Sequence, residues 1–459
     1  MKMKAIVVGA GELGRLLAKT LCEQNYDVVI LDSDYEELER LGERLDIQRI
    51  CGSCTNIAIL KKAGIETADA LIAVSGDEAA NILSCQLASR LGVKRTICRL
   101  FRSDSISESD GITPQDFGIW ATFSTPESSV RKIHEVLDNK AVLEKILFGH
   151  ADACMAIVRI SSSSQLLGMR LRDIACGSII DNVRIAAVLH GSQFLIPHGE
   201  TILGKDDKIY VAGRRDHVET FIDWITSSAE QIKNGRVVIA GAGVTGMLLA
   251  KKAARSGYDV RLIEPNKRLA ESVLDELKNG VMLMHGDPTD EELLEEAGVS
   301  VADVFVSAAD DDENNILSCI IAKRMGAGKV VALTHKPEYI RIVPTMDLID
   351  CGFSATLTSV NTILRLLGGG ALRLDANLMN FGARLAEFKI SSRSPLVGKP
   401  LKDCVLPPCT VLALIFRGTE VITPTGMTCL EQGDTVVTIV TRDTAKRLEP
   451  LFPKEKNNA

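Results

Sequence analysis

Long apolar runs and an excess of positive charge are both missing from this sequence. No stretch of it approaches the roughly 18 consecutive apolar residues that a membrane-spanning helix needs. Residues 1–4 lead directly into an apolar strand pattern, which is not the layout of a secretory signal peptide. The formal net charge of −7 and the pI of about 5.7 give no general electrostatic reason to bind nucleic acid. We therefore expect a soluble cytoplasmic protein with no nucleic-acid partner.

The sequence also lacks a cluster of metal ligands. Its 12 cysteines are scattered through apolar surroundings, as at Cys85 and Cys319, where reduced core thiols are the usual interpretation. Cys404 and Cys409 have no pair of Cys or His residues near them at the spacing of a zinc site. We expect no metal site.

Cys51 and Cys54 form a Cys-x-x-Cys pair that allows two interpretations. Redox chemistry of the thioredoxin type needs the pair at a helix start in a different βαβ setting, so structural cysteines are favoured. None of the 7 histidines stands in a visible nucleophile or proton-relay motif. The nearest candidate is His335, which follows the apolar run 330–333 and precedes Lys336. We expect no catalytic residue.

A glycine fingerprint, G-x-G-x-x-G, occurs twice, 241 − 9 = 232 positions apart. Each copy follows a β-branched run and opens a helical pattern, and an acid follows 18 positions after its third glycine, Asp32 in the first copy and Glu264 in the second. Two matches in register are a much stronger signal than one. The first copy consists of Gly9, Ala10, Gly11, Glu12, Leu13 and Gly14, and the second of Gly241, Ala242, Gly243, Val244, Thr245 and Gly246.

The spacing of the fingerprint has a physical reason. The first glycine makes the tight turn, the second lets the backbone approach a pyrophosphate at the helix N-terminus, and the third lets helix and strand pack closely. Asp32 ends an apolar run, so its carboxylate can accept hydrogen bonds from an adenosine ribose. That carboxylate would repel a 2′-phosphate, and Ser33 supplies no cation, which favours NAD(H) over NADP(H). The alternative, a glycine turn without a ligand, weighs more for the second copy, where Pro265 follows the acid.

The repeat extends beyond the fingerprint. Residues 81–85 recur unchanged as 315–319, at an offset of 234. A different segment is duplicated too, because the Leu-Gly turn of 167–173 parallels 397–403. The sequence thus predicts two larger units with the fingerprint, here called N-units, that alternate with two smaller C-units. The predicted boundaries are 1–137 for the first N-unit, 151–227 for the first C-unit, 235–368 for the second N-unit and 384–453 for the second C-unit.

The predicted fold class is α/β, with two Rossmann-like, doubly wound parallel sheets. Strands at 47–51, 70–74 and 96–100 alternate with helices at 36–45, 56–63 and 78–91. The C-units read as hairpins with short helices, an α+β pattern. Turns at 52–55 and 75–77 share the carboxyl edge of the first sheet with the fingerprint, which is where ligands bind in such sheets. Residues 367–370 read as a flexible joint.

The chain resembles the peripheral NAD-binding regulatory subunits of Trk-type potassium uptake systems. In that family two RCK (KTN) nucleotide-binding domains are each followed by an RCK C-terminal domain. The motifs are both fingerprints with their acids, the segments 286–298, 312–317 and 336–339, and the Leu-Gly turns of the C-units. The likeness covers essentially the whole chain, and the order of four units is more specific than any single motif.

The resemblance implies a function without catalysis. It implies a cytoplasmic homotetrameric ring, peripheral on the inner face of the cell membrane, that gates a potassium-translocating membrane subunit in response to NAD(H) and to ATP or ADP. Arg99 would be a phosphate partner, whereas Leu333 stands at that position in the second repeat. Two departures from the family pattern are the sequence of 52–55 and the segment 103–120. Beyond the fingerprints, the predicted site residues are Asp32, Ser53, Cys54, Ser75, Gly76, Asp77 and Arg99 in the first repeat and Glu264, Asp287 and Ala308 in the second.

Two rival functions stay open. The first is an NAD-dependent oxidoreductase, which would need an acid or base beside the nicotinamide and a substrate pocket. The second is a nucleotide sensor for some other transporter or channel.

Overall fold

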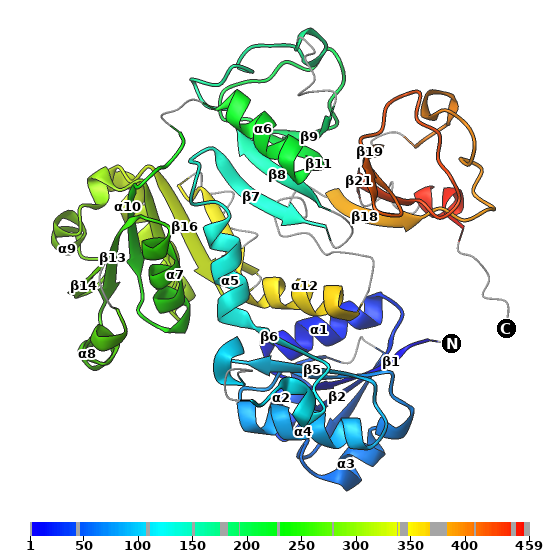
Figure 1. The fold of residues 1–459 in the computed structure, drawn as a ribbon, viewed down its shortest axis with the longest axis vertical. Coiled ribbons are helices and arrows are strands. Elements are labelled where there is room, and N and C mark those ends of the chain that lie inside the picture. The colour runs from blue at the N-terminus through cyan, green and yellow to red at the C-terminus, as the bar shows by residue number, and fades with distance from the viewer. Residues whose placement is uncertain are drawn as a thin grey trace. The chain divides into compact units, whose positions relative to one another are not determined.

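The fold is described from a computed structural model, which divides the chain into two compact bodies (Figure 1). Body 1 consists of Met1–Arg131, Leu333–Pro337 and Phe353–Gly369, and body 2 of Lys132–Ala332, Glu338–Gly352 and Gly370–Ala459. The structure describes residues 2–453 except 43–45, 107–110, 149–151, 175–181, 192, 227–229, 278–279, 337, 340–347, 368–382, 408–409 and 442–446. Most of the predicted joint at 367–370 and Cys409 lie outside the described residues.

The first N-unit is a six-stranded parallel sheet with the order β3-β2-β1-β4-β5-β6. Its strands are β1 (Lys4–Val8), β2 (Asp27–Asp32), β3 (Ile47–Cys51), β4 (Ala70–Ala73), β5 (Arg95–Leu100) and β6 (Ala121–Ser124). Its helices are α1 (Glu12–Glu23), α2 (Tyr35–Glu39), α3 (Ile57–Lys62), α4 (Glu78–Arg90) and α5 (Thr125–His134). The strand order reverses between β1 and β4, which opens a crevice at the carboxyl edge of the sheet.

One local prediction for this unit is wrong in extent. The helix expected over 36–45 begins at Tyr35 and ends at Glu39, and residues 43–45 of that prediction lie outside the described residues. Asp34 caps its start, because the Asp34 side chain accepts a hydrogen bond from the backbone N–H of Glu36 at 2.8 Å. Turn residues through Gly42, with φ +70°, follow the helix.

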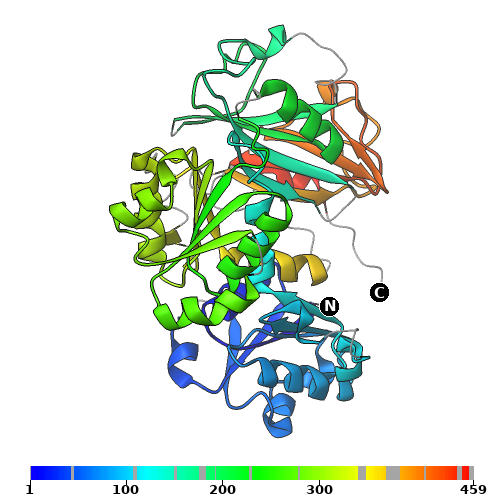
Figure 2. The same ribbon diagram turned by 60° about the vertical axis from the view of Figure 1, so that its left-hand side comes forward.

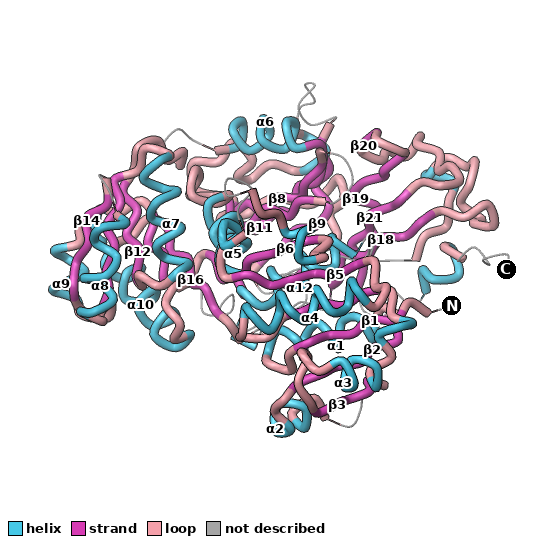
Figure 3. Tube along the Cα trace, turned by 60° about the horizontal axis from the view of Figure 1, so that its bottom comes forward, coloured by secondary structure: helices cyan, strands magenta, loops and turns pink. Residues whose placement is uncertain are grey.

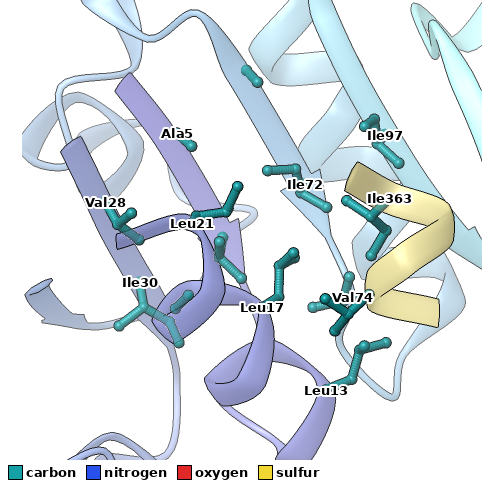
Figure 4. Packing of buried hydrophobic residues seen from close by; sticks show 14 of the residues in the cluster. Ala5, Leu13, Leu17, Leu21, Val28, Ile30, Ile72, Val74, Ile97 and Ile363 are labelled. Atoms are coloured by element: carbon teal, nitrogen blue, oxygen red, sulfur yellow. The ribbon is translucent and has the colours of Figure 1, made fainter. Parts of the chain in front are cut away.

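A helix from the end of the second N-unit covers one face of this first sheet. Helix α12 (Ala355–Leu367) lies beside α1, and Ile363 packs into the same apolar cluster as Leu17 and Ile97 (Figures 1 and 4). The opposite face is closed by α3 and α4, with Leu60 and Cys85 fully buried there. The core of the first N-unit therefore contains residues from both repeats.

The second N-unit repeats the first with the strand order β14-β13-β12-β15-β16-β17. Its strands are β12 (Arg236–Ala240), β13 (Asp259–Glu264), β14 (Val281–His285), β15 (Val304–Ser307), β16 (Lys329–Thr334) and β17 (Cys351–Ser354). Its helices are α7 (Val244–Arg255), α8 (Lys267–Val273), α9 (Glu291–Glu296) and α10 (Asp312–Met325), which alternate with the strands along the chain (Figure 3). The prediction of two Rossmann-like parallel sheets is confirmed.

The C-units are antiparallel sheets within body 2. The first has the order β10-β9-β11-β8-β7 and carries helix α6, drawn in green at the top of Figures 1 and 2. The second has the order β18-β21-β19-β20. The rings of Phe148 and Phe416 meet edge to face between the two units, with centroids 5.8 Å apart. The elements are β7 (Val142–Leu147), β8 (Ala153–Arg159), β9 (Val183–His190), β10 (Gln193–Leu195), β11 (Lys208–Arg214), α6 (Arg215–Ile225), β18 (Ala383–Lys389), β19 (Thr410–Arg417), β20 (Glu420–Ile422) and β21 (Thr435–Thr441).

Across the part of the chain that the structure describes, no helix is both long and apolar enough to traverse a lipid bilayer.

Candidate nucleotide-binding site

A cavity of about 760 Å³ opens at the carboxyl edge of the first sheet, within body 1. This volume lies in the range of small-molecule and cofactor sites. Here the cavity is called site one. The predicted residues that line it are Gly9, Gly11, Glu12, Leu13, Asp32, Ser53, Cys54, Ser75, Gly76, Asp77 and Arg99.

The three glycines of the first fingerprint have three different roles. Gly9 has φ +101°, and a Cβ atom there would lie 2.8 Å from the backbone of Ser75. A Cβ atom on Gly14 would lie 1.8 Å from the carbonyl oxygen of Gly9, so Gly14 serves the packing of α1 on β1. A Cβ atom on Gly11 would meet nothing within 4 Å. The turn therefore requires a glycine at position 9 and the helix packing requires one at position 14, whereas Gly11 leaves open space at the start of α1.

The N-terminus of α1 faces site one. Gly11 is the N-cap residue of α1 and supplies no side-chain hydrogen bond to the helix. The first N–H groups of a helix have no partner within it, and together with the helix dipole they attract anions. Ala10 lies in the turn itself, outside the lining of the cavity.

Asp32 stands at the end of β2 with its carboxylate fixed by two backbone amides. Oδ2 accepts a hydrogen bond from the N–H of Ala10 at 2.5 Å, and Oδ1 accepts one from the N–H of Asp34 at 2.9 Å. The side chain is partly exposed and lines the cavity. A carboxylate has about four acceptor positions, so it can still accept hydrogen bonds from ribose hydroxyls.

Arg99 provides a cation at the other side of site one. Its Nη1 lies 3.5 Å from the carbonyl oxygen of Val74, and its guanidinium stands 5.9 Å from the centroid of the Phe101 ring. Among the described residues, its Nε is buried without a hydrogen-bond partner. Burial lowers the pKa of Arg99. A largely buried guanidinium of this kind suits an anionic ligand group.

Several lining residues were not predicted. One group lies close to predicted site residues along the chain, and this position could have indicated it: Ser33, Asp34, Glu37, Gly52 and Thr55. Thr125, His335, Ala355 and Thr356 line the other side. His335 follows a strand of the second N-unit, yet it lines the cavity of the first. No sequence pattern indicated this, because it depends on where α12 packs.

The second fingerprint has the same backbone geometry. Gly241 has φ +100°, a Cβ atom on Gly246 would lie 1.8 Å from the oxygen of Gly241, and one on Gly243 would meet nothing within 4 Å. Glu264 accepts hydrogen bonds from the N–H of Ala242 at 2.7 Å and of Asn266 at 2.8 Å. At 5% exposure, however, Glu264 is more enclosed than Asp32. The other predicted fingerprint residues, Val244 and Thr245, form the first turn of α7.

The second N-unit differs from the first in charge. Leu333, at the position of Arg99, is buried, and so is Ala308. The loop after β15 contains Asp310 and Asp311, and Asp287 accepts a hydrogen bond from the N–H of Thr289. The second N-unit therefore lacks the cation that Arg99 provides in the first.

The Cys-x-x-Cys pair lies at the rim of site one. The thiol of Cys51 lies 3.6 Å from the carbonyl oxygen of Ser33, and that of Cys54 lies 3.9 Å from the carbonyl oxygen of Ala80. Burial raises the pKa of Cys54, which disfavours a reactive thiolate. Within the described ranges the structure records free cysteines and no cluster of three or more metal-ligating side chains.

Comparisons with known proteins identify the family. The TrkA-N domain matches residues 5–109 and 237–350, and the TrkA-C domain matches 155–226 and 385–452. The chain is 31% identical over 458 residues to Trk system potassium uptake protein TrkA homolog 1 of Methanosarcina mazei, covering 98% of this chain and 100% of that protein. It is 29% identical to Trk system potassium uptake protein TrkA of Vibrio alginolyticus, covering 98% of each.

Solved structures with the same fold belong to RCK proteins. The GsuK RCK domain superposes with a TM-score of 0.61 at 16% identity, over 98% of this chain and 95% of that one. The GsuK channel bound to NAD gives a TM-score of 0.59 at 17% identity, over 98% and 79%. Two N-units and two C-units in alternation, with full-length relatives at this identity, show that the chain belongs to the family of Trk system potassium uptake proteins TrkA.

Proposed function

We propose that this chain is the nucleotide-binding regulatory subunit of a Trk-type potassium uptake system. In this proposal NAD(H), ATP or ADP binds in site one and gates potassium movement through a membrane subunit. The observation that carries it is the open space at Gly11, flanked by the carboxylate of Asp32 and the guanidinium of Arg99 in one cavity. Family membership supplies the link to potassium uptake.

The ligand class follows from the chemistry of the cavity. Asp32 and Ser33 provide a ribose acceptor and no cation for a 2′-phosphate, which supports NAD(H) over NADP(H). A GsuK channel has been solved with NAD and a GsuK with ADP. An adenosine diphosphate moiety is common to both ligands, and the groups around Asp32 and Gly11 would bind that moiety.

A homotetrameric ring is part of the proposal. Leu83 on α4 and Leu317 on α10 occupy equivalent positions in the two repeats, and their side chains are 41% and 47% exposed. Each helix also buries an apolar face on its own sheet. Apolar side chains at matching outward positions support contacts with further copies of the chain, in a ring at the cytoplasmic face of the membrane.

Catalysis is the second candidate, and one observation favours it. His335 lines site one, and histidine is the residue type that most often serves as an acid or base in enzymes. The two candidates predict different results with NADH. A regulatory subunit binds NADH without consuming it, whereas an oxidoreductase oxidises it when a carbonyl substrate is present.

Potassium flux tests the proposal. A Trk-type membrane subunit is reconstituted into vesicles with or without this chain, and flux is measured with NADH, NAD⁺, ATP, ADP or no nucleotide. We expect nucleotides to change the flux only when the chain is present. A flux that ignores every nucleotide contradicts the gating role. Steady NADH oxidation with carbonyl compounds favours the oxidoreductase instead, and association with a different membrane protein favours a sensor for another transporter.

A further inference from the structure

We infer that site one distinguishes longer from shorter nucleotides, because only the longer ones contact a set of lining residues that the second repeat mainly supplies. This set, here called the distal wall, consists of Thr125, His335, Ala355 and Thr356. In this inference, which rests on the proposed function, the part of a nucleotide beyond its second phosphate contacts His335 and Thr356. Ligands that end at the second phosphate do not reach them.

The strand order sets the direction of the ligand. Asp32 ends β2, on one side of β1, whereas β4, β5 and β6 lie on the other side. A ribose at Asp32 and a pyrophosphate at Gly11 direct the rest of the ligand across β1 toward β4 and β5. Arg99 of β5 stands on that path, and the distal wall lines the same cavity beyond it.

Hydrogen bonds and apolar packing hold the distal wall in place. Thr356 Oγ1 donates to the carbonyl oxygen of His335 at 2.8 Å, and Ser354 Oγ donates to the same oxygen at 3.3 Å. Ser359 Oγ donates to Thr125 Oγ1 at 2.9 Å, which joins α12 to the end of β6. A wall that is already ordered costs a ligand little conformational entropy on contact.

The distal wall also belongs to a helix that is fixed to the first sheet. Thr356 is only 7% exposed, and Val360 and Ile363 of α12 are fully buried in the core of the first N-unit. His335 follows β16 and α12 follows β17, so both come directly from strands of the second N-unit. A ligand that contacts the wall therefore touches chain that leads into the other repeat.

The chemistry of the wall indicates the class of ligand. His335, Thr125 and Arg99 line the cavity, and in our inference their imidazole, hydroxyl and guanidinium groups are the polar contacts for the ligand. A third phosphate, or the nicotinamide riboside of a dinucleotide, would supply the matching acceptors or hydroxyls. ADP ends before this region. The wall thus fits nucleoside triphosphates and dinucleotides and is neutral toward ADP.

Calorimetry on the full chain with ADP, ATP and NADH tests the inference. The binding step that is lost in Gly11→Val is assigned to site one. His335→Ala is compared with the wild type and with His198→Ala, a matched change of an exposed histidine in body 2. We expect His335→Ala to weaken ATP and NADH by about tenfold, as for one lost hydrogen bond to a ligand, and to leave ADP within about twofold. His198→Ala should leave all three unchanged.

A second variant tests whether His335→Ala weakens binding only because it disturbs the fold. Thr356→Val keeps the volume of the side chain and removes the hydrogen bond to His335, so ATP and NADH should again lose affinity while ADP does not. An equal loss for ADP, ATP and NADH would mean that the wall only supports the shape of the site, and no loss for any would mean that the ligand does not reach it. Either result overturns the inference but leaves the proposed function standing. Absence of all nucleotide binding in the wild type would instead overturn the proposed function itself.

Discussion

Arg95 donates a hydrogen bond of 3.0 Å to the carbonyl oxygen of Leu367, the last residue of α12. Lys329 occupies the equivalent position in the second repeat, since it is the first residue of β16 as Arg95 is the first residue of β5. The Nζ atom of Lys329 donates hydrogen bonds to the carbonyl oxygens of Val136 at 2.7 Å and Asn139 at 3.2 Å, two residues just beyond α5. In each repeat, a cation at the start of a strand thus binds the end of a helix that leaves the other repeat. Cations at helix C-termini satisfy free carbonyl groups and complement the helix dipole.

Because of this exchange, the first N-unit is incomplete without α12. We expect Ile363→Ala to destabilise body 1 by about 2–4 kcal/mol, since a fully buried isoleucine is replaced by a cavity. Arg365→Ala, an exposed change on the same helix, should cost about 0.5 kcal/mol or less. Urea unfolding is followed through Trp120 of body 1 in a Trp224→Phe background, because the chain has 2 tryptophans and Trp224 lies in body 2. Equal midpoints for both variants would show that α12 does not stabilise the first sheet.

Asp32→Arg should reverse the preference between NADH and NADPH. The change removes the ribose acceptor and adds a partner for a 2′-phosphate. In a thermal-shift titration, a ligand at 100 times its dissociation constant stabilises by about 2.7 kcal/mol, so the loss of the NADH response is measurable. Asp27→Arg, at the exposed start of the same strand, is the control. An undiminished thermal shift with NADH in Asp32→Arg would show that Asp32 does not contact the ligand.

Arg99→Leu should make the first site resemble the second, where Leu333 stands at this position. A charge-assisted contact to phosphate is worth about 1.5–3 kcal/mol, so nucleotide affinity should fall about tenfold or more. The measurement is calorimetry on the full chain, since a fragment of residues 1–230 lacks α12 and His335. Arg102→Leu removes an exposed cation paired with Asp104 and should have no such effect. Unchanged affinity in Arg99→Leu would show that its guanidinium does not contact the ligand.

The backbone of site one was predictable from the sequence because its determinants are local. The spacing of the fingerprint alone indicates where glycine is required: for the tight turn at Gly9, for the approach of a ligand at Gly11 and for helix packing at Gly14. Strand alternation likewise predicted the parallel sheets. The distal wall was not predictable, because the apolar pattern of α12 shows that it must be buried but not against which sheet. Nothing in the sequence therefore indicated that His335, which follows a strand of the second repeat, lines the cavity of the first.

Burial was the other property that the sequence could not supply. Asp32 and Glu264 stand at equivalent positions and accept equivalent backbone hydrogen bonds, yet Glu264 is more enclosed. The exposure of a side chain depends on how the rest of the chain packs around it, which a local motif does not specify. The ligand-binding roles of the second set of residues and the boundaries of the four units stay predictions.

Asp350 supports a prediction about pH. Its carboxylate, 2% exposed, binds Arg159 of β8 at 2.5 Å, Lys323 of α10 at 2.7 Å and the N–H of Val330 at 2.8 Å. Burial alone would raise the pKa of Asp350, but the two cations and the hydrogen bonds outweigh it and hold the pKa below its usual range. Folding therefore favours the charged form. The resulting stability is present above about pH 4, the usual pKa of an unfolded Asp, and is lost as the pH falls through the lower folded-state value.

We expect Asp350→Asn to destabilise body 2 by about 3 kcal/mol at pH 7, because it leaves two partly buried cations unpaired. The difference from the wild type should shrink as the pH falls below about 4 and through the lower folded-state pKa, because the wild-type carboxylate then becomes protonated as well. Trp224 fluorescence during urea unfolding, in a Trp120→Phe background, reports on body 2. Asp173→Asn breaks only an exposed ion pair and should cost about 0.5 kcal/mol or less at either pH. A pH-independent difference for Asp350→Asn would contradict the assigned charge interaction.

Gly11→Val separates nucleotide binding from folding and so tests what the nucleotide is for. Gly11 has φ −58° and ψ −179°, a conformation open to any residue, and a Cβ atom there meets nothing within 4 Å. The valine side chain would instead fill the space through which a pyrophosphate approaches α1, so NADH and ATP should no longer bind at site one while the ligand-free melting temperature stays unchanged. Gly243→Val is the matched substitution in the second repeat and should leave binding at site one intact. Because a ligand shifts a conformational equilibrium only through its different affinities for the two states, potassium flux should lose its response to nucleotide in Gly11→Val. If this variant assembles, binds no nucleotide at site one and still gives the wild-type flux response to every nucleotide, then site one is not the regulatory input, and any gating role moves to the second N-unit.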